Sequence, residues 1–97
     1  MNIRFVGIDG LGGHEVNRIF SKLTDFDFIK SVDIRQFLNS WGEVLDIYDV
    51  NIEIKPDRDD VSIHIFDNSI YIVDTSCKYD EAIIYIDRSA YESLEII

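Results

Sequence analysis

Two alternating runs of apolar and polar residues and one apolar run, all in the second half of the chain, constrain its fold most narrowly. The alternating runs span residues 50–55 and 61–66, and the apolar run spans residues 70–73. Alternation with a period of two puts the apolar side chains on one face of a β-strand. Turn-forming residues occupy 56–60 and 67–69, and such short connections force neighbouring strands to pair antiparallel. The sequence therefore predicts an antiparallel sheet in this half.

The first half of the chain combines one strand pattern with two helical patterns. Residues 2–8 alternate and then become apolar, which is typical of a strand. Residues 14–23 carry an apolar stripe at helical spacing, and a second such stripe follows Asp33, a suitable N-cap. Gly42 predicts a left-handed end to the second helix. The stripes consist of Val16, Ile19, Phe20 and Leu23, and of Ile34, Phe37, Leu38 and Trp41.

Three further segments complete the predicted fold. Residues 24–30 are compatible with a short strand, residues 82–87 with a last strand, and residues 89–97 with a short helix or an edge strand. This order predicts an α+β fold with one mostly antiparallel sheet and two helices packed on one of its faces. A chain of 97 residues is long enough for a single domain, and we assign residues 1–97 to one.

The composition excludes several classes of protein. Hydrophobic residues make up 46% of the chain, which is too much for a disordered tail. No apolar run approaches the ~20 residues that a membrane-spanning helix needs, and the N-terminus lacks the pattern of a signal peptide. Cys77 is the only cysteine and cannot form an internal disulfide. We therefore expect a cytoplasmic protein.

The charge of the chain is concentrated in its second half. Residues 1–42 contain five basic and five acidic residues, whereas residues 43–97 contain four basic and fourteen acidic ones, which accounts for the net charge of −10. Direct binding to nucleic acid or to an anionic membrane requires the opposite sign. We expect neither, and the charge instead favours a basic protein partner.

A glycine-rich segment, residues 6–18, carries the most specific motif. It joins the predicted first strand to the predicted helix and contains Gly7, Gly10, Gly12 and Gly13. The segment resembles the first nucleotide loop of the tubulin-like bacterial division GTPases, and its central glycines also resemble the loop of ThiF-like adenylating enzymes. The resemblance implies phosphate binding at a helix N-terminus. However, Asp9 stands where those families usually carry glycine, and its carboxylate repels phosphate.

The sequence contains no recognisable metal or catalytic motif. The two histidines and Cys77 do not have the spacing of zinc ligands. The acidic segment 57–60 does not belong to a twelve-residue pattern of the kind that binds calcium. No serine lies in a nucleophile elbow, and no base can be assigned to Cys77. We therefore expect no metal, no cofactor and no enzymatic activity.

Tyrosine residues accompany the acidic residues of the second half. All five tyrosines lie between residues 48 and 91, each within a few positions of an Asp or Glu. Tyrosine is enriched at the energetic centres of interfaces, and neighbouring carboxylates complement Arg or Lys of a partner. The alternative is that these rings pack on the sheet. The predicted partner-binding residues are Tyr71, Asp74, Tyr79, Asp80, Glu81, Tyr85 and Asp87.

In size, charge and general character the chain resembles bacterial toxin-immunity proteins, including those of contact-dependent inhibition systems. That resemblance implies a small acidic inhibitor which binds and neutralises a basic partner, such as a toxin nuclease domain or another nucleic-acid-binding protein. The alternative hypothesis is a nucleotide-binding or nucleotide-sensing module that uses residues 7–13. A third possibility is a non-catalytic subunit of a larger assembly.

Overall fold

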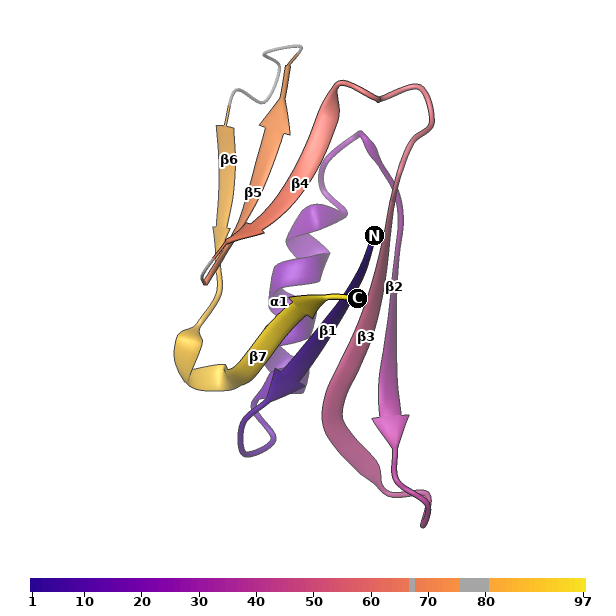
Figure 1. Ribbon diagram of the computed structural model, residues 1–97, viewed down its shortest axis with the longest axis vertical. Helices are drawn as coiled ribbons and strands as arrows, with labels where there is room; N and C mark the ends of the chain where they lie inside the picture. Colours follow the sequence, from indigo (N-terminus) through magenta and orange to yellow (C-terminus); the bar gives the residue numbers. More distant parts are fainter. Residues whose placement is uncertain (67, 76–80) are drawn as a thin grey trace.

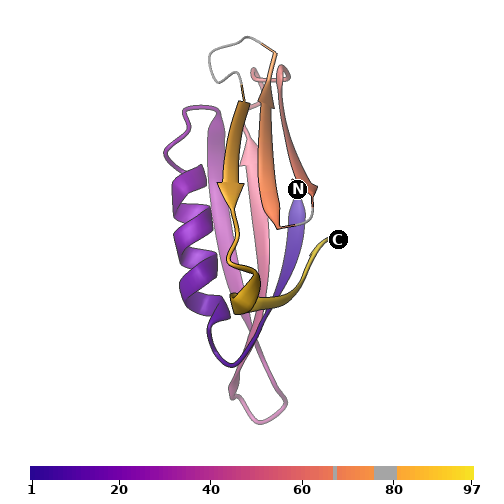
Figure 2. The ribbon, with the colours of Figure 1, turned by 90° about the vertical axis from the view of Figure 1, so that its left-hand side faces the viewer.

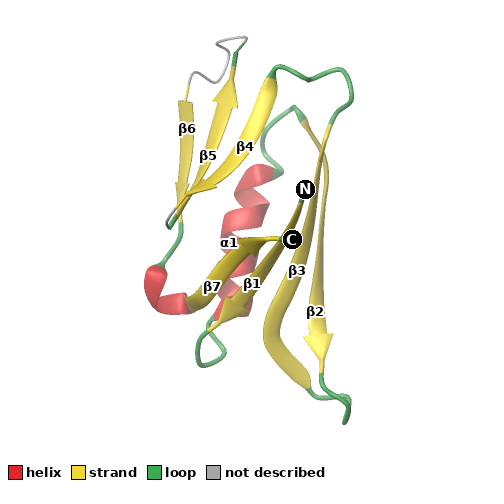
Figure 3. Ribbon diagram, viewed as in Figure 1, coloured by secondary structure: helices red, strands yellow, loops and turns green. Residues whose placement is uncertain are grey.

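Strands dominate the fold of the chain. The computed structural model describes residues 1–66, 68–75 and 81–97, and Figures 1 and 3 show their arrangement. In chain order the elements are β1 (Asn2–Gly7), α1 (Gly12–Leu23), β2 (Ile29–Leu38), β3 (Val44–Ile54), β4 (Val61–Phe66), β5 (Ser69–Asp74), β6 (Glu81–Tyr85), the short 3-10 helix η1 (Arg88–Ala90) and β7 (Tyr91–Ile96).

The strands form two antiparallel sheets. The larger sheet has the order β2-β3-β1-β7, and the smaller has the order β4-β5-β6. The predicted antiparallel pairing of β4 and β5 is confirmed, with Ile63 opposite Ile72 and Phe66 opposite Ser69. The predicted pairing across the turn at 56–60 is wrong, because β3 belongs to the larger sheet and β4 to the smaller. The predicted fold class is wrong, because the described chain has two sheets and one α-helix rather than one sheet and two helices.

The second predicted helix is in fact β2 and the turn that follows it. Val32, Ile34 and Gln36 lie opposite Ile52, Val50 and Tyr48 of β3, so pairing with a long neighbouring strand decides the structure. Ile29, Val32 and Ile34 are β-branched, which favours a strand. The residues that suggested a helical stripe share no buried face, since Trp41 is 84% exposed. The predicted short strand at 24–30 is a turn up to Phe28.

Helix α1 and the smaller sheet pack on the same face of the larger sheet. The predicted helical stripe of α1 is buried, and its residues join those of both sheets in one hydrophobic cluster. Figure 2 shows α1 running along one side of the strands of both sheets. The core consists of residues such as Phe5, Val16, Phe20, Val50, Ile52, Ile63, Ile70, Ile72 and Ile84.

Glu15 ties α1 to the segment between β6 and η1. Its side chain is buried, and Oε2 accepts a hydrogen bond of 3.0 Å from the Asp87 N–H. The other carboxylate oxygen pairs with the Arg18 guanidinium, which also donates to the Tyr85 carbonyl at 2.8 Å. A buried acidic side chain in the first turn of α1 thereby fixes the position of β6.

The opposite face of the larger sheet is polar. Arg4 and Asp49 lie opposite each other on β1 and β3 and form a two-pronged ion pair, with Nε–Oδ1 at 2.9 Å and Nη2–Oδ2 at 3.1 Å. The register continues this row to Arg35 on β2 and Glu95 on β7. Charges of alternating sign thus cross all four strands, which stabilises the pairing of neighbouring strands. Among the described residues, no helix is long and apolar enough to cross a membrane.

Candidate functional site

The glycine-rich loop between β1 and α1 is packed against a carboxylate of β3. Asp9 and Gly10 both have positive φ angles, 53° and 78°, and make the turn. The Gly12 N–H, at the first residue of α1, donates to Asp46 Oδ2 at 3.3 Å. A carboxylate here is favourable for the helix dipole, and it occupies a donor that a phosphate would require.

Two of the glycines make room for Asp46. A Cβ at Gly7 would lie 2.5 Å from Asp46 Cγ, and one at Gly12 would lie 2.5 Å from Asp46 Oδ1. At Gly13, a Cβ would lie 2.6 Å from the Tyr48 hydroxyl. Burial, and next the charge of Asp46, raise the pKa of that hydroxyl. The glycines are therefore explained by close packing against β3, and an anion at the loop would meet the charge of Asp46.

The outer face of the smaller sheet is apolar and uncovered. Phe66 is 70% exposed and Tyr85 66%, and Val73 and Ile83 also expose more than a third of their surface. The register aligns Phe66, Ser69 and Tyr85 in one row, and His64, Tyr71 and Ile83 in the next. We define the aromatic face as His64, Phe66, Tyr71, Val73, Ile83 and Tyr85.

None of the six residues that define the aromatic face is Asp, Glu, Lys or Arg, although the chain carries a net charge of −10. The alternation along the strands explains the aromatic face. Ile63, Ile70 and Ile72 point to the inner face of the smaller sheet and fill the core, so the residues between them point outward. A sheet that is apolar on both faces is unusual for one that meets solvent on one side. Contiguous exposed apolar side chains of this kind mark surfaces that bind another molecule.

The structure places two of the predicted partner-binding residues together. Tyr71 and Tyr85 belong to adjacent strands and both lie on the aromatic face, Tyr71 opposite Ile83 and Tyr85 opposite Ser69. Glu81 begins β6, where its backbone pairs with Val73. Tyr79 and Asp80 lie outside the described residues.

The other two predicted acids have internal partners. Asp74 is 3% exposed, and its Oδ2 lies 3.4 Å from Nη2 of Arg58. Asp87 is exposed, but it caps η1, because its Oδ1 accepts hydrogen bonds from the Ser89 N–H at 3.0 Å and the Ser89 hydroxyl at 2.7 Å. These bonds lower the pKa of Asp87. Both carboxylates therefore contribute to the fold of the chain itself.

Arg58 forms ion pairs with acidic residues from both halves of the sequence. Its guanidinium contacts Asp60 at 3.0 Å, Asp27 at 3.3 Å and Asp74 at 3.4 Å. The hydrogen bond that the guanidinium donates to Asp60 is the main reason that the pKa of Arg58 is raised. Asp27 comes from the half of the chain that is neutral in sequence. The division into a neutral and an acidic half therefore does not correspond to two separate surfaces.

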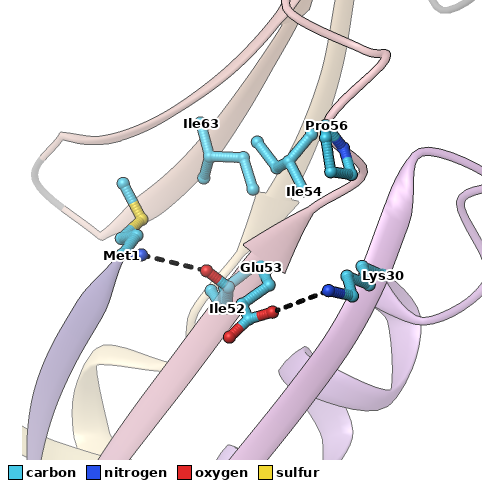
Figure 4. Close-up of a pocket in the computed structure, with 7 residues that line it drawn as sticks. All are labelled: Met1, Lys30, Ile52, Glu53, Ile54, Pro56 and Ile63. Atoms are coloured by element: carbon cyan, nitrogen blue, oxygen red, sulfur yellow. Dashed lines mark hydrogen bonds and ion pairs between the residues drawn. The ribbon is translucent and has the colours of Figure 1, made fainter.

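An open cleft of 420 Å³ lies where β3 leads into β4, and Figure 4 shows its lining. Its walls are mainly apolar, and the ion pair between Lys30 and Glu53 lies at one side, with Nζ and Oε2 3.7 Å apart. The terminal amino group of Met1 donates to the Ile52 carbonyl at 3.0 Å. The lining residues are Met1, Lys30, Ile52, Glu53, Ile54, Pro56 and Ile63.

The two charged side chains that line the cleft, Lys30 and Glu53, pair with each other. Within residues 1–66, 68–75 and 81–97, no group of three His, Cys, Asp or Glu residues could hold a metal ion. His64 lies on the aromatic face beside Ser62, whose hydroxyl is 3.0 Å from Nε2, and His14 is exposed on α1. Cys77 lies outside the described residues. The aromatic face is therefore the best-supported candidate site.

Comparisons with protein-family models, with curated proteins and with solved structures gave no match. The site must be judged from its own residues. Sequence reasoning missed Phe66, Val73 and Ile83, which contribute most of the apolar character of the aromatic face together with Tyr85. Their positions relative to Ile63, Ile72 and Ile84 indicate the outer face once the inner face is known.

Proposed function

We propose that this chain is a non-catalytic, cytoplasmic binding protein that inhibits a basic protein partner by covering it with the aromatic face. The observation that carries the proposal is the exposure of Phe66, Val73, Ile83 and Tyr85 on one uncovered sheet face. A toxin domain that acts on nucleic acid has the required basic surface, as does another nucleic-acid-binding protein.

The shape and chemistry of the aromatic face favour a protein over a small molecule. Small ligands occupy concave pockets, whereas the aromatic face is the outer side of a three-stranded sheet. Its two most exposed aromatic side chains, Phe66 and Tyr85, flank Ser69 in one row. Tyr and Trp with neighbouring apolar groups are typical of the desolvated centre of a protein interface.

The net charge of the chain predicts the sign of the charge on its partner. A charge of −10 attracts a basic protein over several ångströms and accelerates the encounter, and salt screens this attraction. The aromatic face then supplies contacts that hold the complex, because apolar burial is insensitive to screening. The two effects are separable by experiment.

The experiment compares capture by the wild-type protein with capture by Phe66→Ser and Tyr85→Ser variants. A partner is isolated from lysate with the immobilised wild-type protein and purified, and its rates are measured at low and high salt. The control is Leu11→Ser, because Leu11 is 51% exposed on the loop before α1 and lies outside the aromatic face. We expect each face variant to weaken binding at least about fivefold, roughly 1 kcal/mol, with Leu11→Ser unchanged.

Three results would contradict the proposal. The partner could bind both face variants as tightly as the wild type, or it could associate at the same rate in low and high salt. Alternatively, calorimetric titration with ATP, GTP or NAD could give a dissociation constant below about 100 µM. That last result would support the nucleotide-binding alternative, which the Asp46 carboxylate beside Gly12 disfavours.

A further inference from the structure

Strand β2 is a long unpaired edge of the larger sheet. It contributes ten residues, its only neighbour in the sheet order is β3, and it contains neither proline nor glycine. Its register with β3 runs without irregularity from Ser31 to Gln36. An edge of this length and regularity is a template for pairing with another strand.

The centre of β2 has a charge pattern that is complementary to itself. Asp33 and Arg35 are exposed and flank Ile34, which is 37% exposed. When two copies of β2 run antiparallel about a twofold axis at Ile34, Asp33 of each copy lies opposite Arg35 of the other. Both directly opposed pairs then have opposite charge, and cross-strand pairs of this kind stabilise a sheet.

We propose that two copies of this chain form a twofold-symmetric dimer through antiparallel β2–β2 pairing centred on Ile34. The two four-stranded sheets become one continuous eight-stranded sheet, and the contact is the same patch on both copies. Val32 then lies opposite Gln36 of the second copy. The partner for this edge is therefore a second copy of the chain.

The charges also select this register over its neighbours. A slip of two residues in one direction places Asp33 opposite Asp33, and a slip in the other direction places Arg35 opposite Arg35. Like charges directly opposite each other are destabilising. A slip of one residue exchanges the two faces of the strand and separates Ile34 from its counterpart. The pairing centred on Ile34 avoids all of these conflicts.

The exposed apolar residues beyond the centre of β2 fit the same arrangement. Leu38 is 60% exposed and Trp41 84%. The turn that carries Trp41 is ordered by Asn39, whose Oδ1 accepts hydrogen bonds of 2.9 Å from the N–H groups of Trp41 and Glu43. Leu38 ends β2 and Trp41 lies in the turn that follows, so both residues lie next to the proposed pairing edge along the chain.

Among the described strands, no other edge offers such complementarity. The other edge of the larger sheet is β7, whose charged residues are Glu92 and Glu95. In the smaller sheet, β4 has no Asp, Glu, Lys or Arg, and β6 has Glu81 alone. Opposite charges that can pair between identical strands therefore occur on β2. The aromatic face belongs to the smaller sheet, so this proposal does not depend on the proposed function.

The test measures mass in solution by light scattering and sedimentation velocity between about 10 and 200 µM. The variants are Asp33→Arg, Arg35→Asp and the double exchange D33R/R35D. Asp33→Arg places two bases opposite two bases, and Arg35→Asp places acids opposite acids. We expect the wild type and the double variant to dimerise, and each single variant to lose at least tenfold in dimer affinity. An equimolar mixture of the single variants should dimerise again, because each Arg then meets an Asp.

Several controls keep the test decisive. Circular dichroism checks that each variant is folded. Asp33→Arg is the variant that disturbs its own chain less, because residue 33 lies opposite neutral Asn51, whereas Arg35 lies opposite Asp49. Both single variants remain strongly acidic, so general attraction between them does not explain a mixed dimer. A wild-type protein that is monomeric at about 200 µM, or a dimer that Asp33→Arg leaves intact, would overturn the proposal. So would a folded mixture of the single variants that stays monomeric.

Discussion

Replacing Gly7 by alanine tests the explanation of the glycine-rich loop. The three atoms nearest to the added Cβ all belong to the Asp46 carboxyl group, with Cγ at 2.5 Å. Gly7 does not have a positive φ angle, so alanine is compatible with its backbone conformation. The added methyl group therefore conflicts with one side chain, and removal of that side chain should relieve the conflict.

The expected energies follow from these contacts. Overpacking of this kind costs about 1–3 kcal/mol, so Gly7→Ala should destabilise the wild-type protein by that amount. Asp46→Ala removes the acceptor of the Gly12 N–H, and this hydrogen bond contributes about 0.5–1.5 kcal/mol to stability. The same change also removes a buried Oδ1 that has no hydrogen-bond partner among the described residues. With Asp46 absent, alanine at position 7 should stabilise the protein by about 0.4–1 kcal/mol, because it restricts the unfolded chain.

The assay is urea unfolding of the two single variants, the double variant and the wild type. Circular dichroism is the suitable probe, since Trp41 is 84% exposed and its fluorescence changes little on unfolding. Gly12→Ala is the matched control, because its Cβ would also lie 2.8 Å from Gly7 Cα, and Asp46→Ala cannot relieve a backbone contact. Equal destabilisation by Gly7→Ala with and without Asp46 would refute the reasoning.

Four further substitutions should affect stability in predictable ways. Phe20→Ala should cost ~3–5 kcal/mol in denaturant melts, because Phe20 is fully buried, whereas Phe37→Ala should cost much less, since Phe37 is half-buried beneath a guanidinium. Glu15→Ala should cost ~1–3 kcal/mol by leaving a backbone N–H without its acceptor. The pKa of Asp49 is lowered by its hydrogen bond to Arg4, so this stabilisation is full above about pH 4 and lost as the pH falls further. Acid titrations of Arg4→Met should therefore show a smaller loss of stability below that pH.

The strands of the second half were predictable because sequence and pairing agree there. Between β4 and β5, an alternating run and an apolar run flank a short turn, and an antiparallel hairpin is the arrangement that places Ile63 and Ile72 on one buried face. The helix α1 was equally predictable, because Val16, Ile19 and Phe20 define a stripe that has a sheet to cover.

The segment that forms β2 was not predictable from its local pattern. Over eight residues, Ile34, Phe37 and Leu38 satisfy a helical stripe, whereas Val32, Ile34 and Gln36 satisfy a strand. The deciding interaction is the pairing with β3, a neighbour that follows later in the chain. An edge strand also tolerates exposed apolar residues such as Leu38, so burial cannot be inferred from hydrophobicity there.

The candidate site was predictable only in part. Tyr71 and Tyr85 were singled out by residue type, and the sheet register brings them to one face. Asp74 was singled out by its proximity to Tyr71 in sequence, but alternation along β5 turns neighbouring residues to opposite faces. The carboxylate of Asp74 is therefore buried against Arg58, whereas Tyr71 faces outward. Sequence proximity to a tyrosine was the wrong criterion for a strand.

The sequence-based prediction placed acids and tyrosines together at one binding surface. In the structure, these two kinds of residue have separate roles. Asp74 and Asp87 engage Arg58 and Ser89, so they cannot pair with a partner without giving up contacts that stabilise the fold. The six residues that define the aromatic face include no Asp or Glu, so they do not account for attraction to a basic protein. Under the proposed function, acids elsewhere on the surface would act at long range, through a field that salt screens, and would contribute to the rate of association. Phe66 and Tyr85 would act after contact, where burial resists dissociation. We therefore expect such an inhibitor to tolerate changes of single surface acids but to depend on the aromatic residues of one sheet face.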